Sequence, residues 1–216
     1  MGTRTRPMRL GRVAQATVAA LTAVGLWIAV LLPLNARSAE TGNAGAVVSE
    51  LQAALLAVMK QANALGYRGR VRRLTPVITE THDLPSMARY AMGRYWQELS
   101  PKDRNRLVDV FTRFSIANYA ARFDSYKGQT FKQGGTKPQS RKRILVQTVL
   151  VKSGREEVEL NYVLQERSGR WRIVNVMADG VSELAVRRSE FASVLRREGF
   201  PALLDDLEAK ILELAQ

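Results

Sequence analysis

Hydrophobic residues in the first half of the chain recur at helical spacing. Between residues 46 and 65 they repeat every three or four positions, which predicts an amphipathic helix with Gly66 at its end. Pro76 and Pro85 suit helix starts better than helix interiors. We therefore expect two short helical pieces over residues 74–96.

A strong helix start follows at Ser100-Pro101-Lys102-Asp103. Ser can cap the helix, Pro suits its first turn, and Asp faces the positive end of the helix dipole. We expect this helix to run to about Phe123, with its large apolar residues on one inward stripe.

The spacing changes after Gly128 from helical to alternating. Residues 143–151 are almost continuously apolar, and apolar and polar residues alternate over 158–165, which is typical of a strand with one wet face. Residues 130–132 predict a short edge strand, and residues 134–140 a loop. Ser-Gly pairs at 153–154 and 168–169 are expected to form hairpin turns.

Residues 171–177 predict the last strand, and Asp179-Gly180 a turn after it. A helix is then expected from near Ser182 to residue 198, stopped at Gly199, and a final helix over 201–214. Helices followed by an antiparallel meander and two more helices predict the α+β class.

The N-terminus has the layout of a secretory signal peptide over residues 1–39: a basic leader, an apolar run over 13–34 and a small-residue exit. The apolar run also has about the 20 residues that span a bilayer, so an uncleaved anchor stays open. Residues 40–45 are expected to be a linker, and residues 46–216 one domain. Either interpretation predicts export, which makes nucleic acid an unexpected partner.

Composition narrows the possible chemistry. The chain has no cysteine and a single histidine, His82, which excludes a Cys-ligated metal and a His-based zinc site within one chain. The net charge of +13 permits contact with an anionic surface. A basic cluster over residues 67–73 is interpreted either as a solvated turn or as a lipid-headgroup or partner site.

No catalytic set is convincing. Asp83 is expected to cap a helix rather than to form an acid/base pair with His82. Asp205 and Asp206 fit first-turn dipole partners, and Ser182 lacks the sequence of a nucleophile elbow. We predict no catalytic residue, no cofactor and no metal. The excess of large apolar residues leaves two interpretations, a packed core or an apolar cavity.

The segment 171–191 resembles the signature of the periplasmic lipid-binding MlaC/Ttg2D (toluene-tolerance) family, in which a Trp-initiated strand precedes an acidic residue, Gly, a β-branched residue and Ser. Its ending Arg187-Arg188-Ser189-Glu190-Phe191 is similar to the hopanoid-associated, HpnM-like branch. Asp83-Leu84-Pro85-Ser86-Met87 also matches. His82 and Asn175 depart from the family pattern, which usually has an aromatic residue and Asp there.

The resemblance implies a cystatin/NTF2-like fold, with a curved antiparallel sheet and helices around an apolar pocket. It implies a non-enzymatic carrier that binds a phospholipid or hopanoid and shuttles it between the inner and outer membranes. The implied partners are an inner-membrane MCE/ABC-type or RND-type transporter complex and an outer-membrane lipoprotein complex.

The residues expected to line the pocket are Met87, Ala91, Phe111, Phe114, Tyr119, Val146, Leu150, Leu160, Tyr162, Leu164, Val174, Val176, Val181, Leu184 and Phe191. The basic residues expected near its mouth or on a docking face are Arg70, Arg72, Arg73, Arg187 and Arg188. Two alternatives remain: a membrane-tethered adaptor subunit, and an NTF2-like lipid-modifying enzyme using His82 and Asp83.

Overall fold

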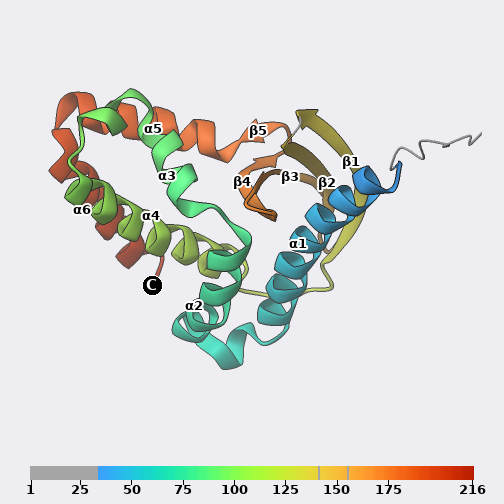
Figure 1. Cartoon of the computed structure of the whole chain (residues 1–216). Helices are drawn as coiled ribbons and strands as arrows, with labels where there is room; N and C mark the ends of the chain where they lie inside the picture. The colour runs from blue at the N-terminus through green and yellow to red at the C-terminus, as the bar shows by residue number, and fades with distance from the viewer. Residues whose placement is uncertain (1–33, 141, 155) are drawn as a thin grey trace, which may run out of the picture. The chain divides into compact units, whose positions relative to one another are not determined.

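The computed structural model describes residues 34–140, 142–154 and 156–216 (Figure 1). Residues 1–33 of the signal peptide or anchor expected over residues 1–39 lie outside the described residues. No helix among the described residues is both long and apolar enough to cross a membrane.

The N-terminal half is helical, as its spacing predicts. Its elements are α1 (Leu34–Lys60), α2 (Ala62–Thr81), α3 (Leu84–Met92), the 3-10 helix η1 (Gly93–Glu98) and α4 (Pro101–Arg122). Helical backbone covers residues 40–45, where the sequence suggests a linker. The helix expected over 46–65 is interrupted after Lys60, and Gly66 then kinks α2 with a φ of 57°, which glycine adopts at little cost.

Two expectations for α2 are wrong. Pro76 lies inside the helix rather than at its start. Leu74 and Ile78, on either side of the proline, are both completely buried, and their packing offsets the hydrogen bond that proline removes. The basic residues 67–73 belong to this helix as well, so they do not form a turn.

The predicted caps are confirmed. The Asp83 carboxylate accepts a hydrogen bond from Ser86 N at 3.1 Å, at the start of α3. Ser100 Oγ accepts from Asp103 N at 3.1 Å, and Pro101 occupies the first turn of α4. Each cap satisfies a backbone N–H that has no partner within its own helix.

The sheet is an antiparallel meander of five strands in the order β1-β2-β3-β4-β5. The strands are β1 (Thr130–Ser140), β2 (Arg143–Val151), β3 (Glu157–Arg167), β4 (Arg170–Ala178) and β5 (Val181–Ser182). The prediction of a loop over residues 134–140 is wrong. A register shift between Gln133 and Thr136 accommodates the two glycines, and edge position tolerates Pro138, so β1 continues to Ser140.

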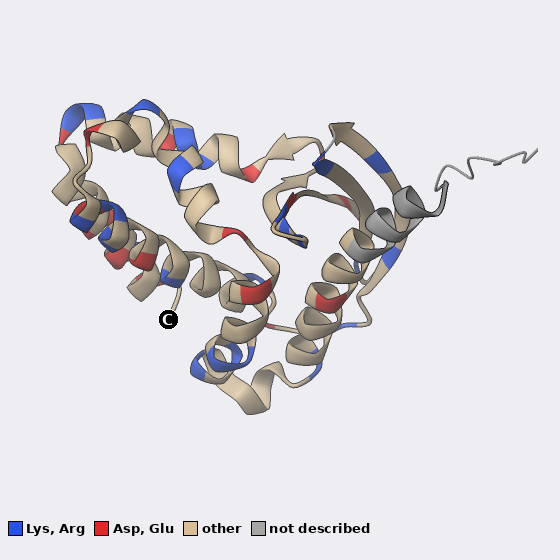
Figure 2. Cartoon of the chain, viewed as in Figure 1, with Lys and Arg blue, Asp and Glu red and all other residues tan. Residues whose placement is uncertain are grey.

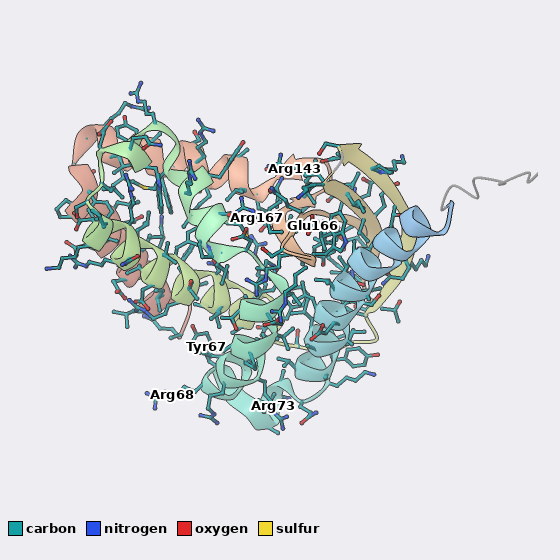
Figure 3. The ribbon with its side chains drawn as sticks, viewed as in Figure 1. Tyr67, Arg68, Arg73, Arg143, Glu166 and Arg167 are labelled. Carbon is teal, nitrogen blue, oxygen red and sulfur yellow. The ribbon has the colours of Figure 1, made fainter. Side chains whose placement is uncertain are left out.

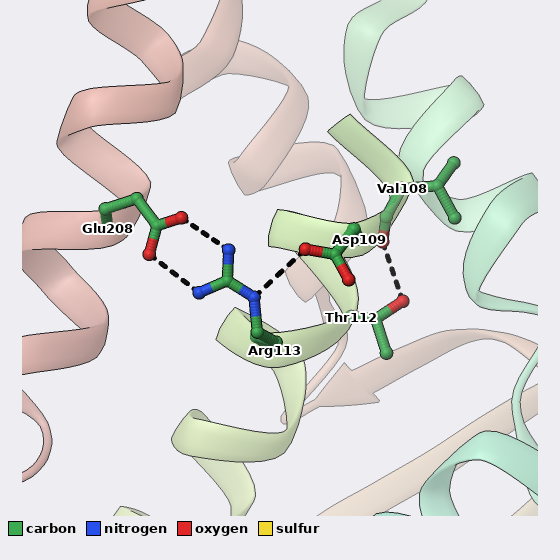
Figure 4. Close-up of polar contacts among 5 residues, drawn as sticks. All are labelled: Val108, Asp109, Thr112, Arg113 and Glu208. Atoms are coloured by element: carbon green, nitrogen blue, oxygen red, sulfur yellow. Dashed lines mark hydrogen bonds and ion pairs between the residues drawn. The ribbon is translucent and has the colours of Figure 1, made fainter. Parts of the chain in front are cut away.

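Two helices complete the chain, α5 (Glu183–Arg197) and α6 (Gly199–Glu213). Ser182 caps α5 by accepting from Ala185 N at 3.1 Å. Helix α1 packs on the sheet, and α4 contacts α2, α3 and α6 (Figure 1). Arg113 of α4 makes a two-pronged ion pair with Glu208 of α6 and also bonds Asp109 at 3.1 Å, which joins the two helices (Figure 4).

Candidate functional site

A cavity of about 440 Å³ lies between the sheet and helices α3, α4 and α5. The sheet contributes alternate residues, since side chains two positions apart share a face. Helix α4 contributes residues three or four positions apart, which share one side of a helix. The lining consists of His82, Leu84, Met87, Phe111, Phe114, Ser115, Asn118, Tyr119, Arg122, Phe123, Leu150, Lys152, Val158, Leu160, Tyr162, Val176, Ala178, Glu183, Leu184 and Arg187.

The structure brings many of the predicted pocket residues together around this cavity. Those that line it are Met87, Phe111, Phe114, Tyr119, Leu150, Leu160, Tyr162, Val176, Leu184 and, among the basic residues, Arg187.

The other predicted residues lie elsewhere. Four are buried in the packed core: Ala91, Val146, Leu164 and Phe191. Phe191 packs edge-on against Phe111, with ring centroids 6.3 Å apart, and so stands behind the cavity wall. Val181 is 57% exposed, because the two-residue β5 places it beside a turn.

Val174 lies outside the cavity lining because the sheet is irregular at this residue. Val163 pairs with Asn175, and Leu164 then pairs with Ile173, which leaves Val174 as an extra residue. Such a bulge reverses the alternation of side chains along the strand. Ile173 is buried and Val176 faces the cavity, whereas Val174 lines a separate groove.

Sequence reasoning missed several polar lining residues on α4. Ser115, Asn118 and Arg122 are four, seven and eleven positions after Phe111, on the same side of the helix. Their spacing could have identified them, but the prediction considered only apolar residues. The other lining residues absent from the prediction are His82, Leu84, Phe123, Lys152, Val158, Ala178 and Glu183.

His82 is a buried wall residue with two hydrogen-bond partners. Its Nδ1 lies 3.0 Å from Thr81 Oγ1, and its Nε2 lies 3.0 Å from the hydroxyl of Tyr119. Burial lowers the pKa of His82 to about 4, so the ring is neutral near pH 7. Asp83 instead caps α3 and lies 3.6 Å from Arg167, so the two neighbours do not act as a pair.

The lining includes four charged side chains, which we call the cavity rim: Arg122, Lys152, Glu183 and Arg187. Arg122 of α4 pairs with Glu183 of α5. The Arg187 guanidinium lies 4.5 Å from the centroid of the Phe114 ring and bonds Glu190 at 2.6 Å. Three of the four rim residues are cationic and each pairs with a carboxylate, with Lys152 bonding Glu156 at 2.8 Å, so an anionic group would compete with these pairs for the cations.

The other predicted docking arginines are away from the cavity. Arg70 donates from Nε to the carbonyl oxygen of Ala120 at 2.8 Å, so it joins α2 to the end of α4. Arg72 and Arg73 are exposed on α2, where basic residues gather (Figure 2). The labelled Arg73 of α2 and Arg143 and Arg167 of the sheet lie in separate regions (Figure 3).

Arg188 lines a second, more open groove of about 720 Å³ beside α3, η1 and the start of α5. Its arginines are Arg89, Arg143, Arg167 and Arg188. Leu184 lines both this groove and the cavity. The groove therefore adjoins the cavity but has a different, mixed polar and apolar lining.

The chemistry of the cavity favours binding. Its walls are mostly aliphatic and aromatic, and the described residues contain no group of three or more His, Asp or Glu side chains that could hold a metal ion. An apolar cavity with a charged rim suits an amphiphilic ligand, because apolar burial supplies affinity and the rim can orient the polar end.

Comparisons with known proteins identify the family and support the fold. The family model described as MlaC protein matches residues 49–209. A solved structure of a phospholipid-binding protein from Ralstonia solanacearum, in complex with a phospholipid, has a similar fold with a TM-score of 0.70. The sequences are 19% identical, and the match covers 82% of this chain and 98% of that one.

Proposed function

Because this chain belongs to the MlaC family, we propose that it is a non-enzymatic lipid carrier of the periplasm. It binds the apolar part of a phospholipid or hopanoid in the cavity and shuttles the lipid between the inner and outer membranes. The observation that carries this proposal is the cavity of about 440 Å³ between sheet and helices. A relative of the same fold has been solved with a phospholipid, which adds support.

The energetics of burial suit such a ligand. Each methylene group moved from water into an apolar site contributes about 0.8 kcal/mol. Ten methylenes would contribute roughly 8 kcal/mol, which is comparable with the roughly 4–15 kcal/mol cost of association. Hydrocarbon length alone can therefore supply useful affinity, and the site needs few directional contacts.

The cavity rim supplies the polar part of the proposal. Arg122, Lys152 and Arg187 can meet a phosphate, since charge-assisted hydrogen bonds favour anionic oxygens. Replacing a rim cation would weaken the binding of an anionic lipid and would leave the binding of a neutral hopanoid unchanged. Measuring the affinities of both lipids in rim variants therefore tests whether the cargo is a hopanoid, as the ending of segment 171–191 suggests.

We place the carrier between an inner-membrane MCE/ABC-type or RND-type transporter complex and an outer-membrane lipoprotein complex. The signal peptide suggested over residues 1–39 supports export. The alternative, a tethered adaptor subunit, predicts that the exported protein keeps its leader. N-terminal sequencing distinguishes the two, because a cleaved carrier starts near Ala39 or Glu40.

The proposal is tested by phospholipid transfer between vesicles, followed with a fluorescent phospholipid. Leu160→Trp fills part of the cavity and should abolish transfer, because Leu160 is a half-buried wall residue. Val163→Trp is the matched control, since Val163 lies on the same strand but lines the second groove, the one that contains Arg188. Equal transfer by the folded Leu160→Trp protein and the wild type would overturn the assignment of the cavity.

A further inference from the structure

The groove beside α3, η1 and the start of α5 is unusual in its charge. Among the described residues, its charged lining consists of four arginines, with no Asp, Glu or Lys. We call it the arginine groove. The arginines come from four elements: Arg89 of α3, Arg143 of β2, Arg167 of β3 and Arg188 of α5. Like charges gathered in one depression produce a positive potential that attracts anions.

These arginines differ from the cations of the cavity rim in how they are paired. Each rim cation has a carboxylate partner. In the part of the chain that the structure describes, three of the groove arginines make no ion pair: Arg89, Arg143 and Arg188. Arg167 has one, with Asp83 at 3.6 Å. The groove therefore carries positive charge that the described residues do not neutralise.

Arg188 is positioned by contacts that do not use its hydrogen-bond donors. Its guanidinium lies 5.1 Å from the centroid of the Tyr90 ring, a cation–π contact. It also covers Gly93, where a Cβ atom would lie 3.0 Å from Arg188 Nε. Neither contact is a hydrogen bond, so the N–H donors stay available. Arginine donors bind a carboxylate with two parallel hydrogen bonds.

The arginines belong to two walls of the groove. Arg89 and Arg188 lie on the helical wall, formed by α3 and α5, which contact each other. Arg143 and Arg167 lie on the sheet (Figure 3). Arg143 pairs with Gln165, two positions before Arg167, so the two arginines are diagonal neighbours about 7–8 Å apart along the backbones. An extended chain in the groove points successive side chains to opposite sides, so consecutive acidic residues would reach both walls.

Aromatic surface in the same groove favours a protein as the ligand. Tyr90 is 48% exposed, and Trp96 also lines the groove. Arg, Tyr and Trp are the residue types that dominate binding energy at protein interfaces. A bilayer surface is flat and would contact protruding residues, whereas a groove accommodates an inserted chain.

We propose that the arginine groove binds an acidic, extended segment of a partner protein. The inference goes beyond the proposed function, because the groove is a separate site that shares Leu184 with the cavity. Consecutive Asp or Glu residues of the segment supply carboxylates to both walls. An apolar or aromatic residue among them packs against the exposed ring of Tyr90.

The first test is the binding of a fluorescent peptide to the full protein, measured by anisotropy. The probe peptide has consecutive glutamates around a central tyrosine, and the control peptide has glutamine in place of each glutamate. We expect the wild type to bind the glutamate peptide and not the glutamine peptide, and to bind more weakly as salt is added. Equal binding of the two peptides, or binding of neither, would overturn the proposal.

Charge-matched double variants locate the binding, at a salt concentration of about 0.15 M, where the Debye length is about 8 Å. Arg143→Gln with Arg188→Gln removes one arginine from each wall and should weaken the glutamate peptide about tenfold, because two charge-assisted contacts are lost. Arg72→Gln with Arg73→Gln removes the same charge from α2 and should leave the affinity unchanged. All four side chains are exposed, so both proteins should fold. Equal weakening in both would show non-specific attraction and contradict the site.

Vesicle sedimentation distinguishes a protein partner from a membrane. Vesicles that contain an anionic phospholipid are mixed with the wild type and with each double variant. We expect the two variants to sediment equally, because they have the same net charge. If the groove variant alone loses vesicle binding and still binds the glutamate peptide, the groove contacts a bilayer and the proposal is wrong.

Peptide binding and lipid binding are separate measurements on the wild type. A protein that holds lipid but does not bind the glutamate peptide would refute the groove and leave the carrier intact. A protein that binds the peptide but never holds lipid would support the groove and refute the carrier.

Discussion

One face of the sheet has two halves that differ in how they are covered. Under α1 the face is solid: Val48, Leu51 and Leu55 are completely buried, and Gln52 bonds Thr148 of β2 at 3.0 Å. Under α4 and α5 the same face borders a cavity of about 440 Å³, where Leu150 of β2 is only half buried. Thr148 and Leu150 are two positions apart on one strand, so similar strand residues border both a core and a cavity.

The difference lies in what holds the helices. Helix α1 lies against the strands, where the bond from Gln52 to Thr148 fixes its distance. Helix α4 is tied to elements away from the sheet: Arg113 joins it to α6, and Arg70 of α2 bonds the carbonyl oxygen of Ala120 near its end. These contacts hold α4 to α2 and α6 and not to the sheet, on whose side the cavity lies.

The largest expected effect is complete loss of bound lipid in Leu160→Asp. The new carboxylate would face the cavity, where an unpaired charge among apolar groups is unfavourable and draws in water. Val181→Asp is the control and should keep its lipid, because Val181 is 57% exposed and does not line the cavity. A folded Leu160→Asp protein that recovers lipid in full would show that the hollow half is not the binding site.

Replacing a leucine by alanine should lower the free energy of unfolding more in the half of the sheet under α1 than in the half that borders the cavity. Leu55→Ala in the solid half should lower the free energy of unfolding by about 3–5 kcal/mol, because it creates a new cavity. Leu150→Ala should cost only about 1 kcal/mol, since its side chain already borders open space. Urea denaturation measures both values. Equal losses would mean that the α4 half is packed as tightly as the α1 half.

The free energy of unfolding should also fall in mild acid, because His82 is buried in the cavity wall. The folded-state pKa of His82, about 4, is below its ordinary value of 6.5, so the unfolded chain takes up the proton first as the pH falls. The stabilisation is complete above about pH 6.5 and is lost toward pH 4. Between pH 7 and pH 5 we expect a loss of about 2 kcal/mol.

His82→Gln is the control for this pH dependence, because glutamine does not titrate. The urea midpoints of both proteins are measured at the two pH values. Both proteins have the same carboxylates, so the difference between them gives the contribution of the histidine. If wild type and variant lose stability in parallel, His82 is protonated easily when folded and the wall around it is wet.

The smallest effect is expected from the tie between α4 and α6. Arg113→Met removes a pair whose side chains are 45% and 44% exposed, and such pairs contribute about 1 kcal/mol or less. Added salt should reduce the difference between variant and wild type further. A loss of lipid binding without a matching loss of stability would show that this tie holds the cavity open.

The sequence predicts most of the elements because their signals are local. Ser100 and Pro101 determine the start of α4, and the apolar run at 143–151 matches β2 residue for residue. The turn at Asp179-Gly180 is confirmed by positive φ angles of 47° and 79°. Each of these features depends on neighbours in the chain, which the sequence displays directly.

The site was harder to predict because it depends on distant contacts. Nothing local shows that β4 has an extra residue at Val174, or that Phe191 stands behind Phe111 instead of beside it. Arg122 was not predicted to line the cavity, because a charged residue is usually expected to face solvent. In the structure it lines the cavity and pairs with Glu183. Whether apolar surfaces meet or stay apart is set by the spacing of helices, which periodicity does not encode.

The account's central claim is that the half of the sheet under α4 and α5 holds a lipid. Native mass spectrometry of the exported protein, purified from a host that makes both phospholipid and hopanoid, tests it most directly when solvent extraction identifies whatever is bound. We predict one lipid per chain, lost in Leu160→Trp and retained in Val163→Trp. A wild-type protein at its bare mass with no extractable lipid would contradict the claim.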